Sequence, residues 1–596
     1  MSVKIAEIDN PPVNALSAEV RLRLRDAIRD PEAEAIVVIG AGKTFIGGAD
    51  IREFDQPPVE PSLPDLLLEL ENLDKPVVAA LNGAALGGGL ETALAAHYRI
   101  ASPTATFACP EVKLGLIPGA GGTQRMPRLI GLSAASDLIA SGRTINAQEA
   151  LELGLIDRIE EGDLRAAAIA QAQSMIGKVP VRTGDLAVQP GPLASIKARG
   201  RIAPVEALRL VSLAAEMPLA EGLAEERATF LKLKQSPQSA ALRHVFFAER
   251  ASGKIEGTPH ELKTIGVVGT GLMGAGIASA ALKAGYRVIA VDQTEEMAAK
   301  GKERIEKLLK APASVSHSLD DLAEADLVIE AVFDDLEVKT ELFKKLDCIV
   351  RPEAILATNT SYLDPDRIAA ATAHPERVIG LHFFSPAHVM RLVEVVRCRR
   401  ASSDVLATGI AFARKLGKLP VVCGVTEGFI GNRMFSAYRN ETEALLMEGA
   451  RPEQIDKAME EYGFAMGPFA VFDLAGLEIA WARRKRQNAP RVIADQLCEA
   501  GRFGQKAGRG WYLYEDGQRR EDPDVTAMIE AARKGTRTIP SDEIVSRLLS
   551  ALRREGQKLL AEQIAARASD IDLVMIHGYG FPAYKGGPMF SAEQAP

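Results

Sequence analysis

The chain has 596 residues, of which 47% are hydrophobic and 25% charged, and it carries a formal net charge of −8 at pH 7. This length predicts about three to five domains of a soluble globular protein, and the negative charge argues against a general nucleic-acid binder. No apolar run is long enough to span a membrane, and the N-terminus lacks the basic and apolar regions of a secretion signal. Five scattered cysteines, never in C-x-x-C spacing, favour a reducing compartment and argue against a zinc site.

Two glycine-rich turns follow predicted buried strands near the N-terminus. Residues 36–40 and 77–81 are short apolar runs typical of strands, and glycine-rich segments follow them at 45–54 and 82–101. A helical pattern begins after the second turn and carries Glu91 in its first turn. Backbone N–H groups at such a helix start point at whatever lies above it.

A second carboxylate, Glu111, lies 20 residues after Glu91, and another glycine cluster follows at 119–122. Paired carboxylates beside glycine-rich backbone suggest acid/base catalysis near an oxyanion site. The same residues also fit a structural interpretation, with Glu91 as a favourable charge at a helix N-terminus and Glu111 as a solvated loop residue. Spacing alone leaves both interpretations open.

Residues 10–160 resemble the crotonase (enoyl-CoA hydratase/isomerase) superfamily at four motifs in the expected order: NPPVNALS, GGADIREF, KPVVAALNGAALGGGLE and PEVKLGLIPGAGGTQRMPRLIG. The resemblance implies a crotonase spiral ββα core, with the N–H groups of Ala49 and Gly88 as the oxyanion hole. It also implies that Glu91 and Glu111 are the catalytic pair. Because hydratases of the superfamily need two carboxylates, hydration of a trans-2-enoyl-CoA is favoured, with Glu111 as proton donor to Cα. A Δ3-Δ2-enoyl-CoA isomerase activity is expected as well.

The chain departs from this family in two places. It starts late, without a further strand that relatives usually carry, and the segment between Phe54 and Lys75 is short. Both are expected to reshape only the pocket rim. Residues 181–261 are predicted to be a connector, turn-rich at first and then a series of amphipathic helices. These helices are expected to pack onto the hydratase core, and a plain helical spacer is the alternative.

Residues 264–293 have the order of a dinucleotide-binding βαβ unit. Gly269, Gly271 and Gly274 form G-x-G-x-x-G between an apolar run and an alanine-rich helical pattern, and a second apolar run ends at Asp292. An acid there can accept hydrogen bonds from ribose hydroxyls and repels a 2′-phosphate, which favours NAD over NADP. In alanine-rich chains a glycine pattern of this kind can instead reflect helix packing alone.

Farther on, His382 begins a predicted strand edge and Glu394 follows 12 residues later. The pair is suited to a general base with an orienting carboxylate, although a lone histidine is more often structural. The whole block from residue 262 resembles 3-hydroxyacyl-CoA dehydrogenase. The resemblance implies that His382 removes the 3-hydroxyl proton, that Glu394 orients its ring, and that Ser361 and Asn432 position substrate oxygens. The NAD contacts that it implies are Gly269, Gly271, Leu272, Met273, Gly274, Asp292, Asp334, Lys339 and Ser385.

The C-terminal part contains a repeat, in which residues 440–468 are similar to residues 555–588 and Asp456 aligns with Asp572. Two copies of one helical unit can bury a shared face, in place of the dimer interface of the single-function dehydrogenase, which favours a monomer. The chain stops eight residues after Pro588, so the second copy is expected to be shortened.

The sequence therefore predicts an α/β multidomain protein with a crotonase core, a Rossmann NAD-binding domain and duplicated all-α C-terminal domains. The expected boundaries are 1–180, 181–261, 262–424, 425–520 and 540–596. The resemblances imply a β-oxidation enzyme that acts on acyl-CoA thioesters with NAD and without a metal. One alternative is an α-subunit that works with a thiolase, and another is a non-catalytic CoA- or NAD-binding scaffold. Since Gln594-Ala595-Pro596 is not the peroxisomal Ser-Lys-Leu signal, a bacterial cytoplasm is the expected location.

Overall fold

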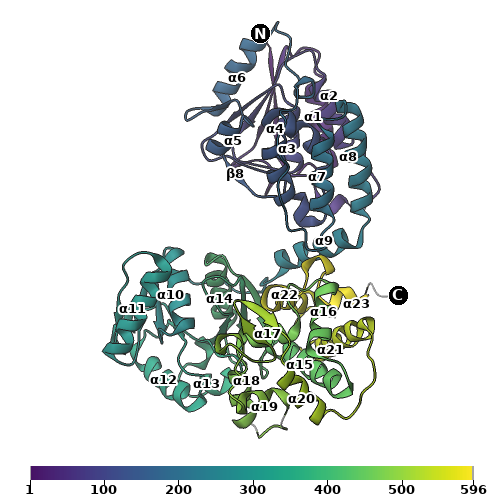
Figure 1. Cartoon of the computed structure of the whole chain (residues 1–596). Coiled ribbons are helices and arrows are strands. Elements are labelled where there is room, and N and C mark those ends of the chain that lie inside the picture. The colour runs from purple at the N-terminus through teal and green to yellow at the C-terminus, as the bar shows by residue number, and fades with distance from the viewer. Residues whose placement is uncertain (1, 55, 487, 491, 594–596) are drawn as a thin grey trace. The chain divides into compact units, whose positions relative to one another are not determined.

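A computed structural model describes residues 2–54, 56–486, 488–490 and 492–593. The chain divides into two compact units, one ending at Arg243 and the other beginning at His244 (Figure 1). Each unit has its own buried apolar clusters, and each carries one group of the predicted site residues.

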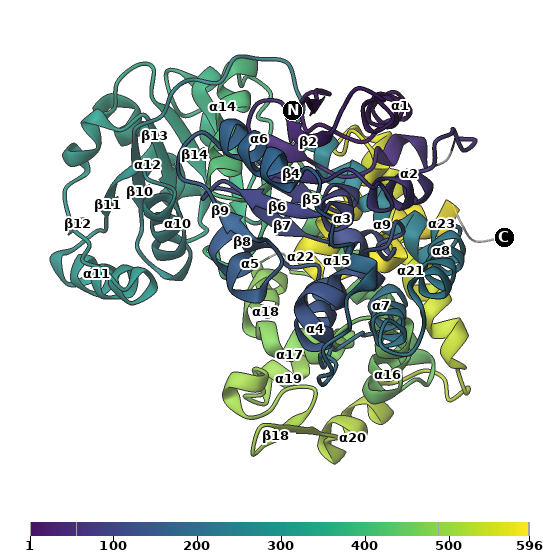
Figure 2. The ribbon, with the colours of Figure 1, turned by 90° about the horizontal axis from the view of Figure 1, so that it is seen from above.

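The first unit is built around two sheets. A five-stranded parallel sheet has the order β1-β2-β4-β6-β9, and helix α6 (Leu164–Met175) packs on one of its faces (Figure 2). Its central strands read as uninterrupted apolar runs because they are buried on both faces. The strands are β1 (Val3–Ile8), β2 (Ala35–Gly40), β4 (Val77–Leu81), β6 (Tyr98–Ala101) and β9 (Arg158–Ile159).

A smaller sheet has the order β3-β5-β7-β8, in which β3, β5 and β7 are parallel and β8 is antiparallel to β7. Successive strands alternate between the two sheets, so the chain advances as a spiral of ββα repeats. The carboxyl ends of β3, β5 and β7 therefore meet at one edge, where the segments that carry Ala49, Gly88 and Glu111 begin. The strands are β3 (Thr44–Ile46), β5 (Ala84–Leu86), β7 (Thr106–Ala108) and β8 (Ile145–Asn146).

The helices of the first unit enclose this edge. Connector helices α7 and α8 pack against α4 and bury Ala207, Leu210 and Leu233 in the same core as the strands, so they belong to the first unit. In the structure, the connector helices therefore pack onto the core of the first unit, as the sequence predicts. The helices are α1 (Ala18–Ile28), α2 (Leu63–Glu71), α3 (Gly88–Ala95), α4 (Gly122–Ser141), α5 (Ala147–Leu153), α7 (Ala203–Leu213) and α8 (Leu219–Lys234). Helix α9 (Pro237–Ala251) spans the boundary between the two units.

The second unit begins with an eight-stranded sheet of order β12-β11-β10-β13-β14-β15-β16-β17. All neighbours are parallel except β15 and β16, and β10 lies at the point where the strand order reverses. This is the doubly wound arrangement in which a dinucleotide binds at the carboxyl ends of the strands. The strands are β10 (Thr264–Val268), β11 (Arg287–Val291), β12 (Val315–Ser316), β13 (Leu327–Glu330), β14 (Ile355–Thr358), β15 (Val378–Phe383), β16 (Leu392–Val396) and β17 (Leu419–Cys423). Its helices are α10 (Leu272–Lys283), α11 (Glu295–Leu309), α12 (Leu336–Ile349), α13 (Pro365–Ala369) and α14 (Ser403–Lys415).

The remainder of the second unit is helical apart from a small hairpin, β18 (Leu513–Glu515) and β19 (Gln518–Arg520). The first long helices of the two repeat copies, α15 and α21, pack on each other. Asp456 of the first copy accepts hydrogen bonds from the N–H groups of Phe469 (2.8 Å) and Ala470 (3.0 Å). Asp572 of the second copy does the same for Met589 (2.7 Å) and Phe590 (3.3 Å). The helices are α15 (Gly431–Glu448), α16 (Pro452–Tyr462), α17 (Pro468–Ala475), α18 (Glu478–Arg486), α19 (Ile493–Glu499), α20 (Pro523–Ala532), α21 (Ser541–Ala561), α22 (Ala568–Tyr579) and α23 (Pro588–Glu593).

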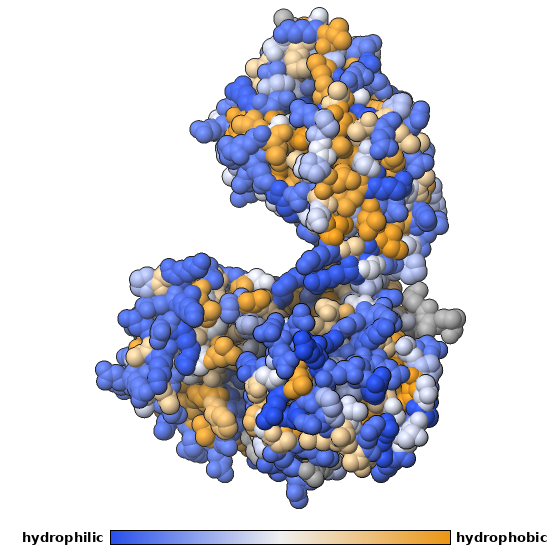
Figure 3. All heavy atoms as spheres, viewed as in Figure 1, coloured by the Kyte–Doolittle hydropathy of each residue, from blue (hydrophilic) through white to orange (hydrophobic). Residues whose placement is uncertain are grey.

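The aligned aspartates thus have the same role in both copies, since each carboxylate binds the start of the helix that follows a Gly-Pro step. On the visible face of the second unit most residues are hydrophilic (Figure 3). Among the residues that the structure describes, no helix combines the length and the apolar character needed to cross a membrane.

Candidate active sites

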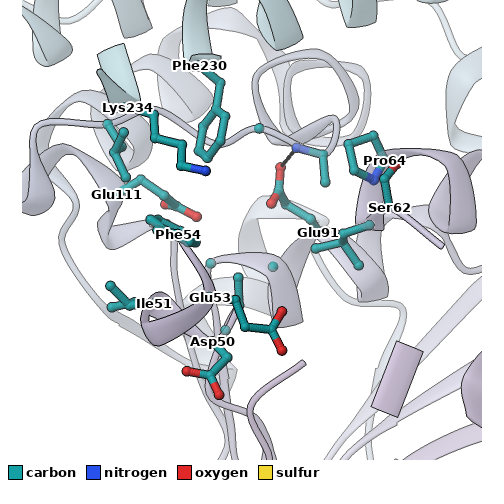
Figure 4. Close-up of a pocket in the computed structure, with 18 of the residues that line it drawn as sticks. Asp50, Ile51, Glu53, Phe54, Ser62, Pro64, Glu91, Glu111, Phe230 and Lys234 are labelled. Atoms are coloured by element: carbon teal, nitrogen blue, oxygen red, sulfur yellow. Dashed lines mark hydrogen bonds between the residues drawn. The ribbon is translucent and has the colours of Figure 1, made fainter. Parts of the chain in front are cut away.

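The first candidate site is a cavity of about 420 Å³ at the edge where β3, β5 and β7 end. Figure 4 shows Glu91 and Glu111 directed into it from opposite sides, together with Phe54, Phe230 and Lys234. The lining is mostly apolar with a few polar groups, which is typical of a site for a large organic ligand.

The backbone of Ala49 and Gly88 lies along the same cavity. A Cβ atom added at Gly88 would lie 3.4 Å from the Ala49 nitrogen and 2.9 Å from Leu63 Cδ2. A side chain at position 88 would therefore require Leu63 to shift, and its Cβ would contact the backbone nitrogen of Ala49. The two predicted oxyanion-hole segments are adjacent, as an oxyanion hole requires.

Glu91 is 3% exposed and projects from the first turn of α3. Its Oε1 atom accepts hydrogen bonds from the N–H groups of Ala120 (2.7 Å) and Gly122 (2.9 Å). Burial raises the pKa of Glu91, and the two backbone donors oppose this because they favour the charged form. The carboxylate is thus oriented by the glycine cluster at 119–122, and Oε2 is not used by these two donors.

Glu111 lies in a short 3₁₀ helix, Pro110–Leu114, directly after β7. Its Oε2 atom is buried and makes no hydrogen bond to any residue that the structure describes. Burial first, and then the charge of Glu91, raise the pKa of Glu111 well above its ordinary value. The two carboxyl groups of the cavity therefore differ, because Glu91 is held by backbone donors and Glu111 favours the protonated form.

The second candidate site contains His382 and Glu394, which face each other in the antiparallel pair β15 and β16. The distance between His382 Nδ1 and Glu394 Oε2 is 2.7 Å, and the glutamate side chain is fully buried. The other oxygen of Glu394 accepts hydrogen bonds from the N–H groups of Ile430 (3.1 Å) and Gly431 (2.9 Å) at the start of α15. The carboxylate is thus oriented on both sides, and it orients the imidazole ring.

Ser361 and Asn432 complete this cluster. Ser361 Oγ lies 3.3 Å from His382 Nε2, the ring nitrogen that faces away from Glu394. Asn432 Nδ2 donates a hydrogen bond of 3.2 Å to the Ser361 carbonyl oxygen. Four predicted residues from four separate segments therefore form one connected group, with His382 at its centre.

The glycine fingerprint has the geometry that NAD needs. Gly269 has φ +87°, a conformation that favours glycine, and a Cβ at Gly274 would lie 1.7 Å from the Gly269 carbonyl oxygen. A Cβ at Gly271 would meet no atom within 4 Å, so the space above the turn is open. Leu272 at the start of α10 is 69% exposed, and Met273 follows it. These residues fit a pyrophosphate at a helix N-terminus.

Asp292 lies beside the turn, at a cavity of about 560 Å³. Its Oδ2 atom accepts hydrogen bonds from the Thr270 N–H (2.8 Å) and hydroxyl (2.6 Å) groups. Ser385 is exposed just after β15. The side chain of Lys339 is fully buried and forms a 2.6 Å ion pair with Glu330.

Lys339 Nζ also lies 3.5 Å from Asp334 Oδ1, and the Asp334 side chain is 36% exposed. The two residues are therefore neighbours, and both stay predicted NAD contacts.

Comparison with protein families identifies three matches in this chain. Residues 1–186 match the enoyl-CoA hydratase/isomerase family, residues 264–426 the NAD-binding domain of 3-hydroxyacyl-CoA dehydrogenase, and residues 428–514 its C-terminal domain. A peroxisomal bifunctional enzyme of Danio rerio is 41% identical over 99% of this chain and 91% of its own length. This chain belongs to the family of bifunctional enoyl-CoA hydratase/3-hydroxyacyl-CoA dehydrogenases.

The chain is similar to two further proteins. A peroxisomal fatty acid beta-oxidation multifunctional protein of Arabidopsis thaliana is 34% identical over 99% of this chain and 91% of that protein. The crystal structure of the dehydrogenase part of multifunctional enzyme 1 from C. elegans is 26% identical, covers 58% of this chain and 87% of that one, and has a TM-score of 0.46. The predicted fold class and the predicted pair of enzyme activities are confirmed for this bifunctional enzyme.

The predicted location in a bacterial cytoplasm is wrong. The Danio rerio and Arabidopsis thaliana relatives are both named as peroxisomal proteins. The prediction rested on the absence of one short C-terminal signal, and such an absence does not determine a compartment.

Sequence reasoning missed the part that α8 plays in the hydratase domain. Arg227, Phe230 and Lys234 of this connector helix line the cavity, and Glu226 is buried beside it. The buried positions of α8 are Gly222, Glu226, Thr229 and Leu233, a helical stripe in which the glutamate is the one charged member. A carboxylate in an otherwise uncharged stripe is the signal that could have identified it.

Proposed function

We propose that the first site hydrates a trans-2-enoyl-CoA to (3S)-3-hydroxyacyl-CoA and that the second site oxidises this product to 3-ketoacyl-CoA, two successive steps of fatty-acid β-oxidation. The observation that carries the proposal is that the two carboxyl groups in the first cavity differ in how strongly their surroundings favour the protonated form. Burial raises the pKa of both groups, but two backbone donors oppose the rise at Glu91, whereas the charge of Glu91 adds to it at Glu111, whose Oε2 has no hydrogen-bond partner among the described residues. Hydration needs one carboxylate and one carboxylic acid.

In the hydratase step, the N–H groups of Ala49 and Gly88 bind the thioester oxygen and stabilise the negative charge that develops on it. Glu91, whose Oε2 remains for a water molecule, directs the water oxygen to C3. Glu111 gives its proton to Cα. The proton that the water loses returns to the carboxyl pair, which restores the starting state. The same oxyanion hole and acid suffice for moving a Δ3 double bond to Δ2, so isomerase activity belongs to the proposal.

In the dehydrogenase step, NAD bound by the fingerprint glycines and Asp292 supplies the acceptor for the hydride that leaves C3. His382 Nε2 removes the proton of the 3-hydroxyl group. The Nδ1 atom donates to Glu394, which keeps Nε2 free of a proton and stabilises the imidazolium that forms. Ser361 and Asn432 are placed to hold substrate oxygens beside the ring. Asp292 favours NAD over NADP because its carboxylate repels a 2′-phosphate.

The division of the chain into a hydratase domain, a connector, a Rossmann domain and two helical domains is part of the same proposal. We propose in addition that the enzyme is a monomer. The packing of α15 on α21 supports this, since the two repeat copies bury a shared face within one chain.

Purified protein mixed with crotonyl-CoA and NAD tests the function. Loss of enoyl absorbance together with NADH formation is expected. Glu111→Ala should block the first signal and leave oxidation of added 3-hydroxybutyryl-CoA unchanged, and His382→Ala should do the reverse. The substituted site should lose activity by about 10²- to 10⁴-fold. Each variant is the folding control of the other. Absence of both reactions, with crotonyl-CoA and with a longer acyl chain, would overturn the proposal.

A further inference from the structure

The glycine-rich segment that orients Glu91 is held by a second carboxylate from the opposite side. Ala120 and Gly122 donate their N–H groups to Glu91. The N–H groups of the alternate residues, Gly121 and Thr123, donate to Glu226 at 2.5 Å and 2.8 Å. The donors therefore alternate along four consecutive residues at the start of α4.

Glu226 is 1% exposed, and it comes from connector helix α8, more than 100 residues from the segment that it binds. The Thr123 hydroxyl lies 2.5 Å from the same oxygen that accepts the Thr123 N–H. Gln124 Nε2 donates to the Thr123 hydroxyl oxygen at 3.1 Å, which leaves the hydroxyl proton for Glu226. Both oxygens of Glu226 are thus acceptors, and the carboxylate receives three hydrogen bonds.

We propose that Glu226 is a positioning residue of the hydratase site, which holds the start of α4 so that the N–H groups of Ala120 and Gly122 orient Glu91. This inference rests on the proposed hydratase function. The N–H groups of residues 120 to 123 belong to consecutive planar peptide units joined at shared Cα atoms, so a shift of one unit is transmitted to its neighbours. A displacement of the Gly121 and Thr123 donors displaces the donors to Glu91 as well.

Electrostatics couples the same two carboxyl groups. Burial, and then the charge of Glu91, raise the pKa of Glu226 to about 8, while the hydrogen bonds from Thr123 and Gly121 oppose the rise. The other charged groups that face this region are Glu111, Arg125 and Arg227. A change at Glu226 therefore alters the charge that Glu91 experiences as well as its position.

This role differs from that of a plain structural contact. A contact that only attaches α8 to the core would change the stability of the first unit and leave turnover by folded molecules unchanged. A positioning residue changes kcat, because misplacement of a catalytic group by about 1 Å can reduce the rate about 10²-fold. It also changes the pH dependence of kcat, because its carboxyl group titrates beside Glu91.

The test compares Glu226→Gln, Thr123→Val and the control Glu225→Gln in the full-length enzyme with crotonyl-CoA. Glu225 is on the same helix but half exposed, in a 3.6 Å ion pair with Arg209. For Glu226→Gln we expect kcat to fall about 10- to 100-fold with KM changed less than about threefold, and the pH profile of kcat to shift. Thr123→Val, which removes only the hydroxyl donor, should lower kcat by about 2- to 10-fold. Glu225→Gln should match the wild type.

Circular dichroism of each variant and its oxidation of 3-hydroxybutyryl-CoA serve as folding controls. If Glu226→Gln does not fold, Thr123→Val decides, because it leaves the carboxylate and the backbone bonds in place. The inference would be overturned if folded Glu226→Gln had the kcat, KM and pH profile of the wild type. If Glu226→Gln does not fold, the same result for Thr123→Val would overturn it. An equal loss of kcat in Glu225→Gln would also overturn it. Absence of hydration in the wild-type enzyme would instead contradict the proposed function.

Discussion

The Tyr579 hydroxyl group donates a 3.0 Å hydrogen bond to Asn432 Oδ1, across 147 residues of sequence. Tyr579 ends helix α22 of the second repeat copy, whereas Asn432 opens α15 of the first copy. The tyrosine ring also lies against Gly431, where an added Cβ would be 2.7 Å from Cε2. The Gly431 N–H binds Glu394, so the second copy supports two residues of the dehydrogenase site. The repeat thus contributes to the site as well as to a shared core.

Tyr579→Phe should lower the kcat of the dehydrogenase about two- to tenfold, because loss of one neutral hydrogen bond is worth about 0.5–1.5 kcal/mol. Asn432 would then lose the partner that orients its amide. Tyr584→Phe, in the same copy, is the control, since its half-exposed ring lies against Gly463 rather than the site. Rates measured with 3-hydroxybutyryl-CoA and NAD check the prediction. Equal effects of the two substitutions would contradict it.

The fingerprint glycines should respond differently to alanine. Gly271→Ala should fold normally, since its Cβ meets no atom within 4 Å, but it should weaken NAD binding at least about tenfold by occupying the space expected for the pyrophosphate. Gly274→Ala should disturb the turn itself, because its Cβ would lie 1.7 Å from the Gly269 carbonyl oxygen. Calorimetric titration with NAD and thermal unfolding distinguish the two. Unchanged NAD affinity in folded Gly271→Ala would contradict the predicted cofactor site.

Lys339→Met should destabilise the second unit by about 3–5 kcal/mol, because it leaves the fully buried Glu330 carboxylate without its 2.6 Å partner. The double variant Glu330→Gln/Lys339→Met should recover part of the loss. Guanidinium unfolding followed by tryptophan fluorescence measures this unit alone, since both tryptophans, Trp481 and Trp511, lie in it. A loss below about 1 kcal/mol would indicate that the ion pair has no structural importance.

The first unit should lose stability as the pH rises from about 4.5 to about 8. Burial raises the pKa of Glu226 to about 8, above the ordinary value of 4.5. The folded state therefore binds this proton more tightly than the unfolded state, so the stabilisation is fully present below the unfolded pKa and is lost once the pH has passed the folded pKa. Glu91 and Glu111 have the same sign, whereas His97, whose pKa is lowered, has the opposite sign.

Hydrogen–deuterium exchange of α3 and α4 follows this change in the full-length enzyme, against pH-matched unfolded reference peptides. In Glu226→Gln, protection of these amides against exchange should depend less on pH than in the wild type. This holds even if the variant is less protected at every pH. An identical pH dependence in both proteins would contradict the raised pKa of Glu226.

Local sequence determined much of this protein. The G-x-G-x-x-G turn depends on residues within one βαβ unit, and the aligned aspartates Asp456 and Asp572 each bind a helix start, 13 and 17 residues farther on. The relation of His382 to Glu394 is also local, because a short hairpin register places them opposite each other. Motifs of this kind are readable because their geometry is completed within a short stretch of chain.

Only the tertiary structure decided the remaining relationships. It placed Lys339 in a fully buried ion pair with Glu330, it brought Tyr579 to Asn432, and it set Glu226 against the segment that orients Glu91. The last two pairs depend on how segments that are far apart in sequence pack around a core. Burial then decides which carboxyl group stays ionised, since desolvation depends on neighbours that are distant in sequence. The residue types of the two sites follow from the sequence, whereas their protonation and support depend on packing.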